Sequence, residues 1–179
     1  MRAMLGVARA SRKRPMNEPH DSLPAPLWLR LVALVYDLLI VVAIMLVANM
    51  IGLAITGGHL LDEHQHLQAW WFPFFEAACV GGYFVTSWRR GGQTVGMRPW
   101  RLRVVAGTGA PAPVGRLLLR LAVAALPLLA LGLSPAIGLP RAALAALAGW
   151  IVWFGLALVD PRRRALHDFA AGTEMRRLD

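Results

Sequence analysis

A single acidic residue lies deep inside the first long apolar stretch of this chain. Arg30 opens the stretch, Asp37 follows, and no other charge occurs before Asn49. Because a helix rises about 1.5 Å per residue, Asp37 would lie roughly 10 Å along the helix from Arg30. On membrane-insertion scales an Asp at such a depth costs roughly 2.5–3.5 kcal/mol. The fold must therefore bring a compensating group to Asp37.

The composition favours an integral membrane protein over a soluble domain. The 179 residues are 57% hydrophobic and only 16% charged, whereas soluble domains carry about 25% charged residues. The apolar residues form long blocks rather than amphipathic stripes. We therefore expect an all-α integral membrane fold with four transmembrane helices in one bundle, and no removable signal peptide.

The apolar blocks set the expected bounds of the four helices. We expect these helices over 27–55, 69–88, 114–133 and 141–159, with a short linker at 134–140. Tryptophans at both ends of the second segment suit the two membrane interfaces, where amphipathic rings prefer to lie. Pro127 is expected to kink the third helix.

The distribution of basic residues predicts how these helices are oriented. The net charge is +9, and 18 of the 19 basic residues are Arg. Nearly all of them lie in the N-terminal segment, the 89–115 loop and the segment after 159, whereas the 56–68 loop has none. Because cytoplasmic loops carry the excess of Lys and Arg, we expect both termini to lie in the cytoplasm. This placement explains the basic charge without a nucleic-acid partner.

The polar segments divide the chain into three expected parts. Residues 1–26 are basic and interrupted by prolines, which predicts a disordered cytoplasmic tail. Residues 27–175 are expected to form the four-helix membrane domain, and 176–179 the C-terminal end.

The long cytoplasmic segments are expected to form a cap beneath the bundle. The 89–113 loop and the C-terminal tail would make this cap. Apolar and basic residues alternate over 101–105, which is typical of a short strand. We expect that strand to pair with residues 173–177.

Four motifs, in order, resemble segments of the RDD family of small bacterial membrane proteins. They are Arg30 with Asp37, the Gly-Gln-Thr-x-Gly segment with Gly91, Gln93, Thr94 and Gly96, the third-helix entry with Arg116 and Arg120, and the closing His167-Asp168. The family is named for one Arg and two Asp residues, so the resemblance, which covers about residues 27–175, implies that Asp168 is the second Asp. It also implies a location in the bacterial inner membrane and a transport role, with sodium/proton exchange suggested for some members. The family often has Lys or Arg where Met97 stands.

The intramembrane carboxylates each have two interpretations. Asp37 is either an ion or proton ligand tuned by Arg30, or a structural partner of Arg30, Arg116 or Arg120. Glu76 lies about two turns inside the second helix, at an expected 5–10 Å in height from Asp37. It is either a second step on a proton or cation path, or a protonated side chain hydrogen-bonded to a neighbour.

Asp168 also has two interpretations. It either closes a cytoplasmic charge cluster with Arg30, Arg98 or Arg116, or caps backbone donors of the tail. We favour the cluster, because the resemblance and the number of nearby cations agree.

Two functions follow from these alternatives. The first is a small transporter or cation/proton exchanger that uses the intramembrane carboxylates. The second is a non-transporting membrane assembly or partner module, in which the Arg/Asp network is structural. Beyond the lipid bilayer, we expect a homo-oligomer or a partner membrane protein, because so few helices cannot enclose a wide path.

No cofactor, metal site or enzymatic activity is expected. Cys79 is the single cysteine, and no residue spacing suggests nucleophilic catalysis. Metal sites need fixed geometry, so the His and acidic residues between the first two helices favour a solvated loop. These residues are His59, Asp62, Glu63, His64 and His66.

Overall fold

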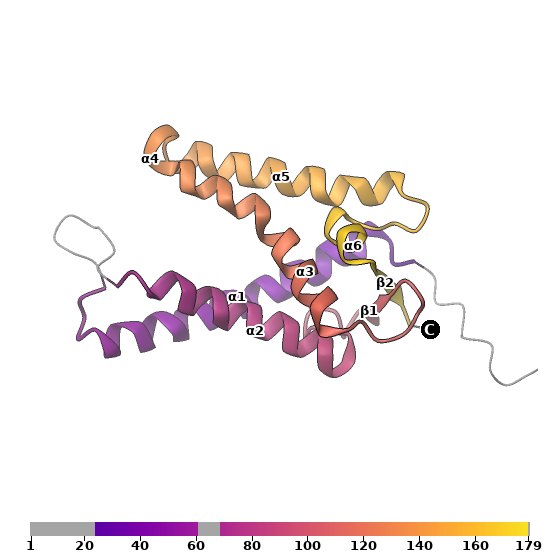
Figure 1. The fold of residues 1–179 in the computed structure, drawn as a ribbon, viewed down its shortest axis with the longest axis horizontal. Helices are drawn as coiled ribbons and strands as arrows, with labels where there is room; N and C mark the ends of the chain where they lie inside the picture. The colour runs from indigo at the N-terminus through magenta and orange to yellow at the C-terminus, as the bar shows by residue number, and fades with distance from the viewer. Residues whose placement is uncertain (1–23, 61–68, 179) are drawn as a thin grey trace, which may run out of the picture.

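The structure, a computed structural model, describes residues 24–60 and 69–178 and is mostly helical. Two long helix pairs extend from the end of the molecule that carries the C-terminus and a small sheet (Figure 1). The first pair is α1 (Leu27–Ile55) and α2 (Phe72–Gly91). The second pair diverges from the first with distance from that end. It consists of α3 (Val114–Ala125), η1 (Leu126–Leu133) and α4 (Ser134–Ile137), followed by α5 (Leu139–Val159).

Three helical stretches are long and apolar enough to cross a membrane. They are Leu27–Ile55, Val114–Ile137 and Leu139–Val159. In the apolar window of each stretch only 17% of the residues are buried inside the chain, so most of these side chains face outward, as lipid contact requires. The helix α2 has 20 residues but is outside this group. Three of the four expected spans therefore meet both criteria.

The observed helix bounds agree closely with the apolar blocks, with one local exception. The helix α1 spans 27–55 as expected, and α2 lies three residues later than expected at each end. The third helix is not continuous, because it tightens into the 3₁₀ helix η1 around Pro127. Pro127 packs on α5 at Gly149, where a Cβ would lie 2.9 Å from the proline Cβ. The expected 134–140 linker is partly helical, since α4 covers its first four residues.

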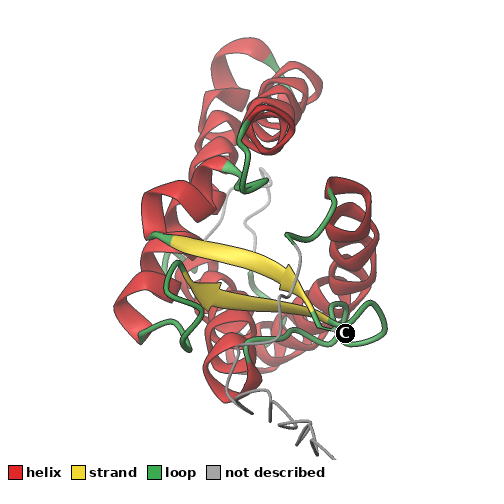
Figure 2. Ribbon diagram, turned by 90° about the vertical axis from the view of Figure 1, so that its right-hand side faces the viewer, coloured by secondary structure: helices red, strands yellow, loops and turns green. Residues whose placement is uncertain are grey.

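The end of the molecule shown in Figure 2 carries a two-stranded antiparallel sheet. The strands are β1 (Leu102–Ala106) and β2 (Thr173–Arg177), with Leu102 opposite Arg177. The expected pairing is confirmed, with β1 one residue later in the chain than predicted. The short helix α6 (Leu166–Ala171) precedes β2. We refer to β1, β2, α6 and residues 89–113 as the cap.

The segment just before α1 is hydrogen-bonded to the cap. Pro24 forms a bridge with Arg176, and the Ala25 amide donates a hydrogen bond to the Met175 carbonyl at 3.0 Å. Ala25 is fully buried. The prediction of a disordered tail reaching to residue 26 is therefore wrong for residues 24–26, and its remainder, 1–23, lies outside the described residues.

The main hydrophobic core lies where the cap meets the helices. It contains Ala25, Leu29, Ala33, Trp88, Met97, Leu102, Val104, Leu117 and Met175. Met97 is 5% exposed. This chain therefore has an apolar core side chain at the position where the RDD family, which its motifs resemble, often has Lys or Arg. Three polar residues, Thr94, Thr173 and Asp168, are among the largest fully buried side chains. They mark two buried polar sites at this end of the molecule.

Candidate functional site

Asp37 is bound by α2 and by the loop that follows it. Its carboxylate accepts hydrogen bonds from the hydroxyls of Tyr83 (2.7 Å) and Thr94 (2.5 Å), and from the backbone N–H of Gly96 (2.9 Å). Asp37 is 2% exposed and Thr94 is fully buried. We call Asp37 with these three residues the Asp37 site.

Gly96 is required for the loop to approach α1 this closely. A Cβ at Gly96 would lie 2.3 Å from the Ala33 carbonyl oxygen and 2.8 Å from both the Cγ and the backbone nitrogen of Asp37. No side chain fits in that space. The loop therefore lies against the backbone of α1, and its N–H can reach the carboxylate.

Neighbouring residues of the Gly-Gln-Thr-x-Gly segment hold the loop in position. Gly92 ends α2 in the left-handed conformation (φ 71°), and its carbonyl accepts a hydrogen bond from Val104 of β1 at 2.7 Å. The Gln93 side chain donates to the Leu102 carbonyl, also at 2.7 Å. Gly91 has no atom within 4 Å of a Cβ built on it. Thr94 and Gly96 thus bind Asp37, whereas the residues before them fix the loop to β1.

Asp168 is the centre of the second buried site. Its carboxylate oxygens pair with Arg30 of α1 at 2.9 Å and with Arg120 of α3. The same carboxylate accepts the Ala165 N–H at 3.1 Å, at the start of α6. Asp168 is therefore both the charge partner and the helix cap that were weighed as alternatives. We call Arg30, Arg120, Asp168 and Thr173 the Asp168 cluster.

Each Arg of the Asp168 cluster has further partners that fix its position. Arg30 donates to the backbone carbonyls of Ala25 (3.2 Å) and Met175 (3.3 Å). Arg120 donates to the Thr173 hydroxyl at 3.1 Å, and its guanidinium lies 5.1 Å from the Trp88 ring centroid. Both side chains are at most 4% exposed. The Asp168 cluster therefore ties α1, α3, α6 and β2 together.

The expected ion-pair partners need two corrections. Asp37 pairs with none of Arg30, Arg116 and Arg120, because its partners are hydroxyl and amide groups of the Asp37 site. Arg116 does not reach Asp168: it is exposed and donates to the Gly172 carbonyl at 3.4 Å. Arg120, one turn later on the same face of α3, takes that position.

His167 and Asp160 titrate outside the membrane-crossing segments. Burial, together with the positive charges of Arg120 and Arg30, lowers the pKa of His167 well below its usual value. The His167 ring packs edge-on against Phe154, with centroids 5.4 Å apart. Hydrogen bonds from Arg164 lower the pKa of Asp160 to about 2. His167 is therefore neutral beside the cluster, and Asp160 is ionised near the end of α5.

Glu76 has a partner on α1 that is far from Asp37. The Asn49 side-chain amide donates to the Glu76 carboxylate at 2.6 Å. Asn49 follows Asp37 by twelve positions, or about 18 Å of helix rise. Glu76 and Asp37 therefore have different hydrogen-bond partners and occupy separate sites.

Sequence reasoning missed several residues of these sites. Tyr83 donates a hydrogen bond to Asp37, Asn49 donates one to the half-buried Glu76, and Thr173 accepts one from Arg120. Their signal in the sequence is that each is a polar residue within or next to an apolar element. Within 24–60 and 69–178, no group of three or more His, Cys, Asp or Glu side chains is placed to hold a metal ion. Of the loop histidines, only His59 is in a described segment.

Comparison with known protein families gives a match that covers most of the chain. The model of the RDD family matches residues 24–172. Neither the curated proteins nor the solved structures gave a match. The matched range includes the Asp37 site, the Asp168 cluster except Thr173, the Gly-Gln-Thr-x-Gly segment and every helix. Because the match covers most of the sequence, the chain belongs to the RDD family.

Proposed function

We propose that this protein is a non-transporting membrane module that assembles with another membrane protein or with a second copy of itself. The observation that supports this proposal is the burial and hydrogen bonding of the Asp37 carboxylate. Its carboxylate is 2% exposed and accepts three hydrogen bonds from the protein itself. A carboxylate that carries ions must exchange such partners for water or for the ion, whereas all three donors to Asp37 are groups of the protein itself. In this proposal the Asp37 site and the Asp168 cluster fasten the cap to the helices.

The exposed faces of the helices support an assembly role. The second helix pair diverges from the first (Figure 1), and the three candidate spans bury few of their residues inside the chain. In a bilayer, helices associate by close packing of small side chains and by hydrogen bonds between helices. The α5 helix is rich in Ala and exposes Ala143, Ala145 and Ala148. These small residues would allow a partner helix to approach closely.

The proposed orientation has four passes, with both termini in the cytoplasm of the bacterial inner membrane. The α2 helix would be the fourth span, because its 20 residues are about 30 Å long. Its one acidic residue, Glu76, is compensated by Asn49. Apart from Arg141, near the start of α5, the basic residues of the described segments lie on the side that this orientation makes cytoplasmic. A periplasmic reporter enzyme that is active when fused after Asp179 would contradict this orientation.

A cation/proton exchanger is the second candidate, and one observation favours it. Within the described segments Asp37 forms no ion pair, although it lies in a candidate membrane span. An intramembrane carboxylate without a fixed counter-charge is a functional-site hypothesis by default. In this case Asp37 would take up the proton or cation when the 92–97 loop moves away.

A flux measurement on proteoliposomes separates the two candidates. Purified protein is reconstituted, a sodium gradient is imposed, and proton movement is followed with an internal pH dye. The variants are Asp37→Asn and, as a matched control in the other carboxylate site, Glu76→Gln. We expect no sodium-driven proton movement above empty vesicles for any of the three proteins. Sodium-driven movement that Asp37→Asn abolishes, with folded yield unchanged, would show that the module proposal is wrong.

A further inference from the structure

We propose that Arg89, Arg90 and Arg103 form a binding site for the phosphate of an anionic phospholipid. The site lies at the C-terminal end of α2, where β1 of the cap packs against it. The inference deepens the proposed function, because it uses the proposed membrane orientation and assigns a lipid contact to the cap. It concerns residues that neither Asp site uses.

A hollow lined by both polar and apolar atoms lies between these three arginines. Its volume is about 120 Å³, which suits a small group such as a phosphate. Besides the three arginines, it is lined by Trp88 and Gly91 at the end of α2 and by Val104 and Gly109 in and after β1. The walls therefore come from two separate parts of the chain, the end of α2 and β1 with the turn that follows it.

The backbone geometry brings Arg103 beside the end of α2. A Cβ at Gly92 would lie 2.8 Å from both the Arg103 Cγ and the Val104 carbonyl oxygen, so only glycine permits this packing. Arg103 Nε donates to the Gly91 carbonyl at 3.0 Å. Its two terminal nitrogens have no protein acceptor within the described segments. The guanidinium is therefore held by one nitrogen, with its other two available to a ligand.

The charge of the hollow has no counterpart in the described parts of the chain. Arg89, Arg90 and Arg103 are exposed and form no ion pair there. Basic residues at a helix C-terminus stabilise the helix dipole, which accounts for Arg89 and Arg90. It does not account for Arg103, which comes from a strand. Arg recognises phosphate through paired N–H donors, so three guanidiniums around one hollow match a phosphate.

The position of the hollow along α2 favours a lipid over a soluble phosphate. A 20-residue helix is about 30 Å long, equal to the hydrocarbon thickness. If α2 crosses the membrane, its last turn lies at the headgroup level. In the proposed orientation that surface is cytoplasmic, where anionic lipids are enriched. Neighbouring phosphates of the bilayer would then be in direct reach of the three arginines.

Native mass spectrometry of the full chain in detergent tests the proposal. The protein is titrated with phosphatidylglycerol, with phosphatidylcholine and with inorganic phosphate. The test variant combines Arg89→Gln, Arg90→Gln and Arg103→Gln. The control combines Arg98→Gln, Arg141→Gln and Arg177→Gln, which removes the same charge from exposed residues outside the hollow. A thermal melt of each variant verifies its fold.

We expect the wild type and the control to prefer phosphatidylglycerol to phosphatidylcholine. The test variant should bind phosphatidylglycerol about a hundredfold more weakly, because each of the three basic residues contributes about fivefold near an anionic surface. Equal affinities of the two variants would overturn the proposal. Stronger binding of inorganic phosphate than of phosphatidylglycerol would show that the occupant is a soluble anion, and the lipid assignment would be wrong.

Two features keep the test decisive. If the triple variant does not fold, Arg90→Gln and Arg141→Gln make the same comparison, with about fivefold weaker binding expected for Arg90→Gln alone. The titration uses the purified chain without a partner or a gradient. If the titration shows no lipid site, the module proposal is therefore unaffected. If the flux assay detects sodium-driven proton movement, the lipid-site proposal is unaffected.

Discussion

The Arg30 guanidinium of α1 lies 2.9 Å from the Asp168 carboxylate of α6, across 138 positions of sequence. Both side chains are at most 2% exposed. Because Arg120 pairs with the same carboxylate, the two cations share one anion. Such a site is stable only while the anion is present.

Asp168→Asn is expected to destabilise the protein strongly. Removing one partner of a buried pair leaves uncompensated charge and costs roughly 3–5 kcal/mol, and here two arginines are left. The loss is measured as the free energy of unfolding in detergent. The control is Arg162→Gln, which breaks the Arg162–Glu174 pair, whose Arg side chain is 62% exposed. That variant should lose less than about 1 kcal/mol; comparable losses for the two variants would contradict the role given to Asp168.

Gly96→Ala is expected to displace the loop from α1. The added Cβ would overlap the Ala33 carbonyl and the Asp37 backbone, and overpacking of this kind costs typically about 1–3 kcal/mol. Gly91→Ala is the matched control from the same segment, since its Cβ would meet nothing within 4 Å. Thermal unfolding of the two variants makes the comparison. Equal stabilities would show that the loop does not need its close approach at Gly96.

The helices could be predicted closely from the sequence because the membrane imposes one simple pattern. Apolar side chains must cover each span, and backbone groups must pair within the helix. The block over 27–55 therefore ends where α1 ends. The β1–β2 pairing could also be predicted, since the alternation over 101–105 is a local signal.

The partners of the two Asp residues could not be predicted, for a physical reason in each case. Arg116 and Arg120 lie on one face of α3, and only the packing of α6 decides which of them reaches Asp168. Asp37 and the Thr94 loop were both noted as motifs. Their contact spans 57 positions and uses neutral donors, so neither helical periodicity nor charge pairing indicates it.

Stability is expected to fall as the pH drops below about 6.5, through His167. In the folded state burial and the charges of Arg120 and Arg30 lower the pKa of His167, whereas the unfolded chain has the ordinary value of about 6.5. Below that pH the unfolded state binds a proton that the folded state does not. The unfolded state is therefore favoured by up to about 1.4 kcal/mol per pH unit.

Melting temperatures between pH 7.5 and 5.0 test this linkage. The groups that face His167 are Arg30, Arg120, Asp168 and the Phe154 ring. His167→Gln removes the titrating group and should flatten the pH dependence over this window. An identical slope for wild type and His167→Gln would assign the pH dependence to other groups.

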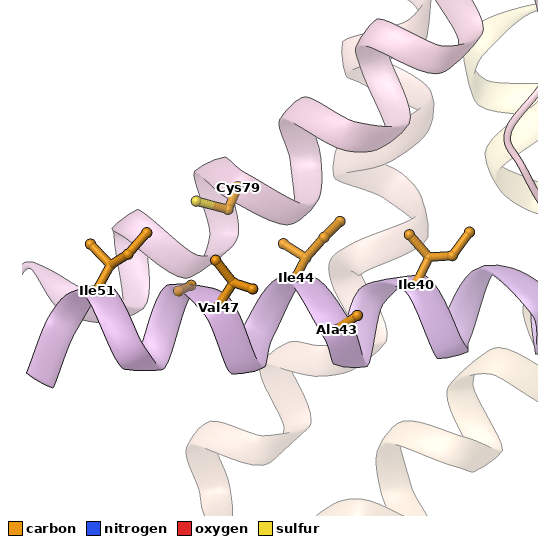
Figure 3. Close-up of a pocket in the computed structure, with 7 residues that line it drawn as sticks. Ile40, Ala43, Ile44, Val47, Ile51 and Cys79 are labelled. Atoms are coloured by element: carbon orange, nitrogen blue, oxygen red, sulfur yellow. The ribbon is translucent and has the colours of Figure 1, made fainter.

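Asn49→Leu is expected to destabilise the α1–α2 pair by leaving the Glu76 carboxylate without its donor. An unsatisfied buried or half-buried polar group costs about 1–3 kcal/mol, and more when it is charged. Near this bond lies an open apolar groove of about 310 Å³, lined by apolar side chains of α1 and by Cys79 of α2 (Figure 3), which offers the carboxylate no other donor. The loss should therefore appear as lower stability of the purified protein in detergent.

A double-mutant cycle shows whether the Asn49–Glu76 bond itself is responsible. Glu76→Leu combined with Asn49→Leu replaces both partners with apolar groups, which is often nearly neutral. The double variant should therefore be more stable than Asn49→Leu alone, with an interaction energy of about 0.5–3 kcal/mol. If the two losses simply add, the bond does not couple α1 to α2. Glu76 would then be a carboxylate in need of another explanation, and a place on an ion path would be the first to test.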